Sequence, residues 1–421
     1  MTVRRNIAAR GVIGRRALDG YKARMKATVP HGRNRAGHLA AEAPVPDSLA
    51  ALTRRIAPRL AGLENAVPVP DGEADWGALV RLAERHRVVP ALAAAVAGRT
   101  DALPEPVAAR LSALGQQAAF EELALAATVR EIIDMLDQRG IGCIVLKGIP
   151  LSLMIHGRLG MRTSRDIDIL VAPRDASAAL DVFKSIGFHR RKGEGVLPSL
   201  MRRRKDVELL HDGRRQIVEL HWRLFDNACL LPLPADMTPG RVALLSGPQC
   251  AVLPERFNLL YLANHGAQHG WSRLKWLVDL AALLAPMGED GIAALYDGIG
   301  WAEGRRSMAQ ALLLCGALFG WPVPDAVRRD AGRDWRIRAL VRIALRVLAG
   351  GGEREIEDIA FATTRKNISH YLLSSAPRYL WNELIFDLND VSGLPPGSRW
   401  RKWGAAGRVA GWITRAGRAH G

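Results

Sequence analysis

The sequence has few cysteines and no long apolar run, and both absences narrow the class of protein. The four cysteines are scattered without Cys-x-x-Cys spacing, at positions Cys143, Cys229, Cys250 and Cys315. This argues against a zinc ribbon or a disulfide framework, and we interpret them as hydrophobic side chains. No run of about 18 or more apolar residues is present, and the basic N-terminus lacks the apolar core of a secretory signal. We therefore expect a cytoplasmic protein without a transmembrane segment.

Acidic residues are nearly absent from both ends of the chain. Residues 1–37 contain ten Lys or Arg and a single acid, and residues 391–421 contain six Lys or Arg and no acid. Of the net charge of +17, only +2 remains between these two segments. The ends, rather than the middle, are therefore the candidates to bind a polyanion or a membrane surface. We expect both ends to be disordered.

The middle of the chain is long enough for more than one domain. The hydrophobic content of the whole sequence, 48%, is sufficient for buried cores. Apolar residues at three- and four-residue spacing predict helices, and alternating β-rich runs predict strands. We expect five parts: a basic tail at 1–46, a helical domain at 47–140, a sheet-and-helix domain at 141–235, a helical domain at 236–390 and a basic Trp/Arg/Gly tail at 391–421.

Two carboxylates are the most informative residues. Asp166 and Asp168 lie within the β-rich run 161–171, so they project from the same face of a strand. Two negative charges beside buried strand residues need compensation, which a bound divalent cation provides. By itself, such a pair would more simply be two solvated aspartates at a strand end.

The residues before this pair are suited to binding phosphate. Residues 144–148 read as a strand that ends in a turn at Lys147 and Gly148, and residues 150–156 as a short helix. Arg162 and Ser164 follow, immediately before the carboxylates. Lys147 is either a phosphate contact or a solvated turn residue.

A hairpin after the pair supplies a third acid. An Asp-Gly turn separates the β-rich runs 207–210 and 216–222. On the second run Glu219 and His221 share one face, so Glu219 is placed to join the two aspartates. Glu208 on the first run is the fallback, and a surface ion pair with Arg214 or Arg215 is the other interpretation of Glu219.

This order of elements resembles the uncharacterised nucleotidyltransferase family of the polymerase-β-like nucleotidyltransferase superfamily. The resemblance implies an α+β fold, in which a palm of mixed β-sheet and helices is flanked by helical domains. It also implies that Asp166, Asp168 and Glu219 bind two Mg²⁺ or Mn²⁺ ions around a nucleoside triphosphate. The enzyme would then transfer NMP to an acceptor hydroxyl and release pyrophosphate.

One departure bears on the activity. The superfamily turn commonly reads Gly-Ser, whereas here Gly148 is followed by Ile149. The phosphate contacts would then come from Lys147, the Gly148 amide, Arg162 or Ser164. The acceptor is a small molecule, a protein or peptide side chain, or a tRNA 3′ end, among which the sequence does not choose. The alternative function is a catalytically silent nucleotide- or RNA-binding module on the same fold.

A second polar segment lies at residues 264–280. We expect one helix here, with residues 265, 269, 272, 276 and 279 on one face. His265 and His269 have the spacing of a zinc pair, but residue 266 is glycine rather than the glutamate that a zinc protease needs. The resemblance covers this segment, and makes His269, Lys275 and Asp279 candidates to contact the triphosphate, base or acceptor. The alternative is a polar face buried against the palm. We expect Lys275 to face differently from Asp279.

Overall fold

The computed structural model describes residues 45, 47–60, 75–97, 103–190, 196–234, 236–244, 249–349 and 362–389. The tails predicted at 1–46 and 391–421 lie outside these residues, Val45 excepted. The predicted domain boundaries stay a prediction.

A five-stranded mixed sheet forms the β part of the molecule. Its strand order is β1–β2–β5–β4–β3, with β2 and β5 parallel and the other neighbours antiparallel. The strands are β1 (Cys143–Val145), β2 (Asp166–Val171), β3 (His189–Arg190), β4 (Asp206–His211) and β5 (Gln216–His221). Strands β4 and β5 form the hairpin that the Asp-Gly turn predicted. A separate two-stranded sheet, β6 (Gly240–Ala243) and β7 (Gln249–Val252), contacts β1.

The two faces of the sheet differ in polarity because side chains alternate along each strand. On one face Ile167, Ile169, Val218 and Leu220 are buried in a core that includes α9 (Ala176–Ser185) and the C-terminal half of α7 (Glu105–Asp137). The opposite face carries the acids of β2, β4 and β5. Burying the apolar face fixes the register that turns these acids away from that core.

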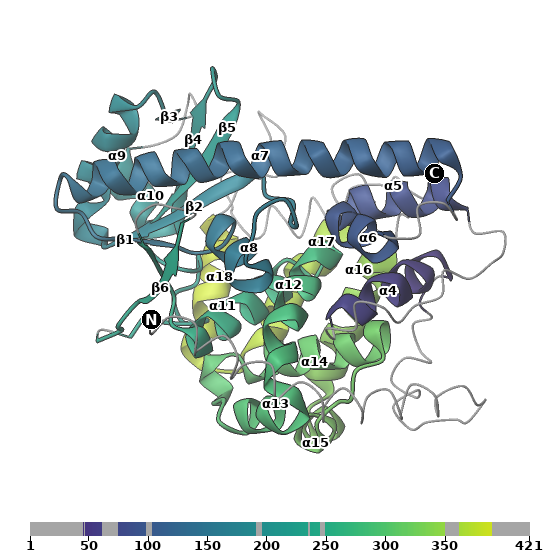
Figure 1. Cartoon of the computed structure of the whole chain (residues 1–421). Helices are drawn as coiled ribbons and strands as arrows, with labels where there is room; N and C mark the ends of the chain where they lie inside the picture. Colours follow the sequence, from purple (N-terminus) through teal and green to yellow (C-terminus); the bar gives the residue numbers. More distant parts are fainter. Residues whose placement is uncertain are drawn as a thin grey trace, which may run out of the picture.

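Helix α7 joins the sheet to the helical part of the molecule. It runs along one side of the structure, from beside α5 and α6 to the sheet (Figure 1). Leu111, near its start, belongs to the core of the helical part, whereas Val129 and Ile132, near its end, belong to the core of the sheet. One continuous helix therefore contributes to both cores.

The remaining helices pack mainly in one block. Before the sheet come α4 (Asp47–Leu60), α5 (Trp76–His86) and α6 (Val89–Val96), and within the sheet region come α8 (Ile149–His156), the 3₁₀ helix η3 (Pro173–Asp175) and α10 (Leu197–Arg203). After the sheet come α11 (Glu255–Gln268), α12 (Leu274–Leu284), η4 (Ala285–Met287), α13 (Gly288–Asp297), η5 (Trp301–Glu303), α14 (Arg305–Phe319), α15 (Asp325–Arg333), α16 (Trp335–Ala349), α17 (Ala362–Leu373) and α18 (Pro377–Asn389). This architecture confirms the predicted α+β class. None of the described helices is long and apolar enough to cross a membrane.

The prediction of a single helix over 264–280 is wrong. Helix α11 ends at Gln268 and α12 begins at Leu274. Between them Gly270 and Trp271 have φ of 58° and 52°, in the left-handed region that ends a right-handed helix. The Trp271 amide bonds back to the Gly266 carbonyl at 2.8 Å, and its fully buried ring packs against that glycine. The break is thus stabilised by tertiary packing of one large side chain.

Gly266→Ala tests this packing. A Cβ at position 266 would lie 2.4 Å from a ring atom of Trp271, so the ring must shift. We expect a destabilisation of about 1–3 kcal/mol, the usual range for overpacking a core. The matched control is Gly115→Ala in α7, where a Cβ meets nothing within 4 Å, and where removing a helical glycine should stabilise by about 0.5–1 kcal/mol. Equal urea midpoints for the two variants would contradict the packing argument.

Candidate functional site

The polar face of the sheet gathers acidic side chains across adjacent strands. Asp168 on β2 is directly opposite Glu219 on the parallel strand β5, and Asp206 on β4 is opposite His221. Ligand atoms of Asp168, Glu219 and His221 all lie within 4.8 Å of one another. Asp166, two residues earlier on the same face as Asp168, is half-buried and outside this group.

His221 lies at the centre of these carboxylates. Its Nε2 is 3.2 Å from a Glu219 oxygen, 3.3 Å from Asp168 Oδ1 and 3.6 Å from Asp206 Oδ2. The sequence placed His221 on the face of Glu219 but gave it no role, and Asp206 was not considered. The Glu-x-His alternation on β5, with its Glu219 opposite Asp168, was the signal that would have found His221 once the strand pairing was known.

Two lysines compensate the acids. Lys147, in the turn after β1, lies 3.1 Å from Asp168 Oδ1 and only 12% of its side chain is exposed. Lys205 pairs with Asp206 and lies 3.5 Å from Glu219. The interpretation of Lys147 as a solvated turn residue is therefore wrong. Of the two partners in the alternative interpretation of Glu219, Arg214 pairs with Glu131 instead, and Glu219 lies beside Lys205 and His221.

The surroundings shift the pKa values of the two aspartates in opposite directions. Burial raises the pKa of Asp168, against the lowering effect of Lys147. Burial also acts to raise the pKa of Asp166, but Lys147 and Lys275 together hold it below its usual value. For Glu219, burial is outweighed by His221 and Lys205, and its pKa falls far below the ordinary value. Asp166 and Glu219 are thus kept ionised, as cation ligands must be.

The donor set fits a divalent cation. Asp168 is fully buried, and its Oδ2 has no hydrogen-bond partner among the described residues. Carboxylate oxygens and an imidazole nitrogen are the ligands that divalent metals take in proteins. A cation bound here would satisfy the unpaired oxygen and add positive charge to a cluster rich in acids.

Gly148 connects this cluster to the start of α8. It is the N-cap residue of that helix, with φ 74° and ψ −123°, a conformation that side chains other than glycine rarely adopt. Leu146, two residues earlier, donates from its backbone to the Asp168 carbonyl at 3.1 Å. The positive end of α8 therefore begins beside the carboxylate strand, where it favours an anion.

Arg162 and Ser164, predicted to contact phosphate, are both buried and engaged with each other. Arg162 donates to Ser164 Oγ at 2.7 Å and from Nε to both oxygens of Asp279 at 3.0 Å. The backbone amide of Gly160 donates to the buried carboxylate of Glu122 on α7. The segment between α8 and β2 is thus fastened to α12 and to α7.

Lys275 and Asp279, on α12, face the same segment. Lys275 donates to the Thr163 carbonyl at 3.1 Å, next to the Arg162 that binds Asp279. The expectation that the two side chains face differently is wrong, because residues four apart share a helix face. Burial and the neighbouring Arg162 lower the pKa of Lys275 to about 7.

Helix α12 is itself positioned by the N-terminal helices. The Leu274 amide at its start donates to Nδ1 of His86, at the end of α5, at 3.2 Å. The adjacent Arg273 donates to the Arg85 carbonyl. Burial and the nearby Arg85 and Arg273 lower the pKa of His86, which keeps the ring neutral and able to accept. His86 is therefore a buried structural residue.

His269, the remaining predicted contact, belongs to an aromatic cluster next to Lys147. The rings of His269 and Trp276 are 5.0 Å apart with planes 33° apart, and both side chains are half-buried. His265, 4.5 Å from His269 between ring centroids, has Nε2 3.3 Å from the Lys147 ammonium. The cluster is therefore connected to Asp168 through the contacts of Lys147 with His265 and with Asp168.

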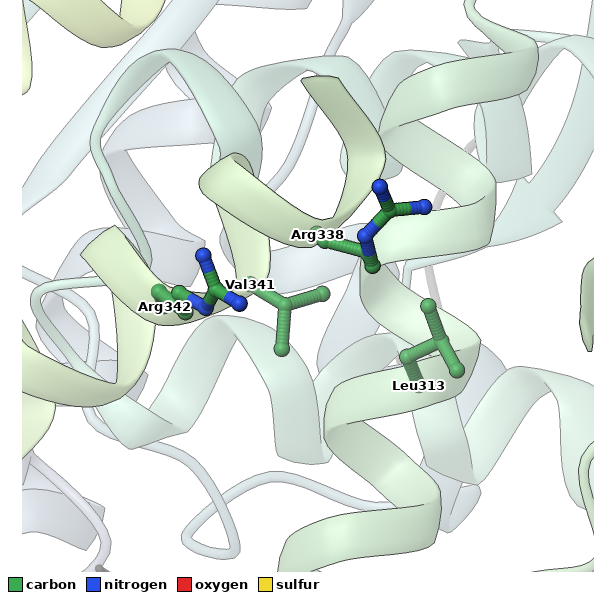
Figure 2. Close-up of a pocket in the computed structure, with 4 residues that line it drawn as sticks. All are labelled: Leu313, Arg338, Val341 and Arg342. Atoms are coloured by element: carbon green, nitrogen blue, oxygen red, sulfur yellow. The ribbon is translucent and has the colours of Figure 1, made fainter. Parts of the chain in front are cut away.

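A small pocket elsewhere carries none of this chemistry. It lies between α14 and α16 and is lined by Leu313, Arg338, Val341 and Arg342 (Figure 2). Arg338 donates to the carbonyls of Ala331 and Gly332, so it caps the C-terminal end of α15. No acidic residue lines this pocket, in contrast to the face of the sheet.

The comparisons with known proteins agree with the fold. Curated proteins gave no match to the chain. The model of the family described as uncharacterised nucleotidyltransferase matches residues 72–320, more than half of the sequence. That match covers α5 to α14 and includes every residue of the acidic face. The chain therefore belongs to the uncharacterised nucleotidyltransferase family.

Proposed function

We propose that the protein is a divalent-metal-dependent nucleotidyltransferase that moves NMP from a nucleoside triphosphate to an acceptor hydroxyl and releases pyrophosphate. The observation that carries the proposal is the pairing of Asp168 with Glu219 across β2 and β5, beside the glycine start of α8. Family membership supports nucleotidyl transfer in general. Phosphoryl transfer requires charge neutralisation and positioning more than a protein nucleophile, which suits a site of carboxylates and lysines.

We assign cation binding to Asp166, Asp168 and Glu219. Bound divalent ions would neutralise charge on the phosphates and orient the attacking hydroxyl. Asp168 is the deepest of the three, and Asp166 and Glu219 lie nearer the surface. The nucleotide would therefore approach from the side of Asp166 and Glu219.

The triphosphate has two candidate sources of positive charge besides the cations. Lys147 lies against Asp168 and Gly148 caps α8, so both are within reach of a phosphate bound at the carboxylates. With a cation on Asp168, Lys147 no longer has to balance that carboxylate and is available to a phosphate oxygen. Lys147 and the start of α8 would thus take the place of the hydroxyl that a serine at position 149 would supply.

Arg162, Ser164 and Asp279 act as positioning residues in this proposal. Their mutual hydrogen bonds hold the segment that leads into β2. His269 and Trp276 present half-buried rings near Lys147, and we assign to them contact with the base or the acceptor. The acceptor itself is not identified.

Asp168→Asn and Glu219→Gln test the metal assignment. In calorimetric titrations with each NTP and Mg²⁺, we expect each variant to bind at least about tenfold more weakly than wild type, since loss of a ligand should match or exceed the 10–100-fold effect of outer-shell changes. The matched control is Asp181→Asn, an exposed acid paired with Lys184 on α9, which should bind as wild type.

The two variants guard against misfolding as an explanation. Asp168→Asn leaves the buried Lys147 short of a partner, whereas Glu219 is partly exposed and its amide should be tolerated. Nucleotide binding that is unchanged in both variants would overturn the assignment. Binding that needs no divalent ion would favour the silent nucleotide-binding module instead.

Asp279→Asn tests the positioning role of α12. It removes the charge that balances the buried Arg162, and breaking a buried ion pair from one side typically costs about 3–5 kcal/mol. We expect a lower urea midpoint together with weaker NTP binding under native conditions. Asp325→Asn, an acid paired with Arg328 on the surface, is the control and should change stability by less than about 0.5 kcal/mol. Native-like stability of Asp279→Asn would contradict the positioning role.

A further inference from the structure

His221 is an unusual residue to find among the carboxylates of a metal-dependent phosphoryl-transfer site. It is 1% exposed and lies on β5, which is hydrogen-bonded to β2 on one side and to β4 on the other. A side chain on a central strand has little freedom to withdraw when a cation binds. Its imidazole will therefore remain beside any ion held by Asp168 and Glu219.

The spacing of the donor atoms suits a shared ion. Neighbouring ligands of one octahedral ion with bonds of about 2.1 Å lie about 3.0 Å apart. His221 Nε2 lies 3.3 Å from the Asp168 oxygen and 3.2 Å from the Glu219 oxygen. The nitrogen thus lies where a ligand atom would lie, and small side-chain rotations would complete the contact.

One unpaired atom supports a missing ligand at this cluster. Asp168 Oδ2 is buried and has no hydrogen-bond partner among the described residues. The Asp168 side chain is fully buried. Buried polar atoms without partners are rare in native structures, and they often mark an ion or water that binds there.

We propose that His221 Nε2 is a direct ligand of the bound cation, so that Asp168, Glu219 and His221 form a mixed oxygen and nitrogen centre that binds Mn²⁺ more tightly than Mg²⁺. This rests on the metal site of the proposed function and adds the identity of one ligand and the preferred ion. Mg²⁺ favours oxygen ligands and its own waters, whereas first-row transition ions accept imidazole readily.

A different arrangement would place His221 as a charged neighbour of the carboxylates. In that arrangement the imidazolium would repel the ion or turn away from it, and only oxygen atoms would bind. The two arrangements differ in whether nitrogen is bonded to the metal, which can be measured without any nucleotide and without turnover.

Pulsed EPR of the full-length chain with Mn²⁺ makes this measurement. We expect a nitrogen hyperfine coupling in wild type that changes to the ¹⁵N pattern when histidine alone is ¹⁵N-labelled, and that is lost in His221→Gln. The control His189→Gln, a half-exposed histidine on β3, should keep the coupling. Bound Mn²⁺ with no histidine coupling, or no bound Mn²⁺ at all, would overturn the proposal.

Metal titrations supply a second readout. We expect wild type to bind Mn²⁺ more tightly than Mg²⁺, and His221→Gln to reduce that preference about tenfold or more, since an amide oxygen replaces the nitrogen. An unchanged preference would contradict the ligand role. Failure of the proposed function gives a different result. Histidine-coordinated Mn²⁺ without metal-dependent NTP binding would support the metal centre and contradict the nucleotidyltransferase function.

Discussion

The structure depends on balancing negative charge that is buried on one face of a β-sheet. Asp168 is fully buried, and an ionised carboxylate in that position is costly unless positive groups or hydrogen bonds compensate it. Lys147 and His221 supply that compensation, while Lys205 does the same for Asp206 and Glu219. The acids therefore persist as a group because lysines and hydrogen bonds surround them, and a bound metal would take over part of this role.

The helical part of the molecule positions the segment that leads into β2. His86 fixes the start of α12, and Asp279 on α12 holds Arg162 just before β2. Lys275 adds a bond to the backbone of that segment. The helices thus do more than enclose the sheet, because they set the position of the strand that carries the two aspartates.

Local patterns predicted much of this arrangement. The strand around Asp168, the hairpin with Glu219 and the glycine start of α8 follow from side-chain alternation and turn residues within a few positions. The break between α11 and α12 does not follow from local patterns, since Gly266 favours it only through the packing of Trp271. The position of His221 among three carboxylates likewise required the pairing of β2 with β5, and strands 50 residues apart in sequence carry no local sign of that register.

A crystal structure of the full chain grown with Mn²⁺ and a non-hydrolysable nucleoside triphosphate tests the central claim most directly, with the ions located by anomalous scattering. The account predicts Mn²⁺ bonded to Asp168 and Glu219, with the triphosphate between that ion and the start of α8 and with Lys147 turned from Asp168 toward a phosphate. Nucleotide bound away from β2 and β5, or Lys147 still paired with an ion-free Asp168 in the presence of bound nucleotide, would contradict it.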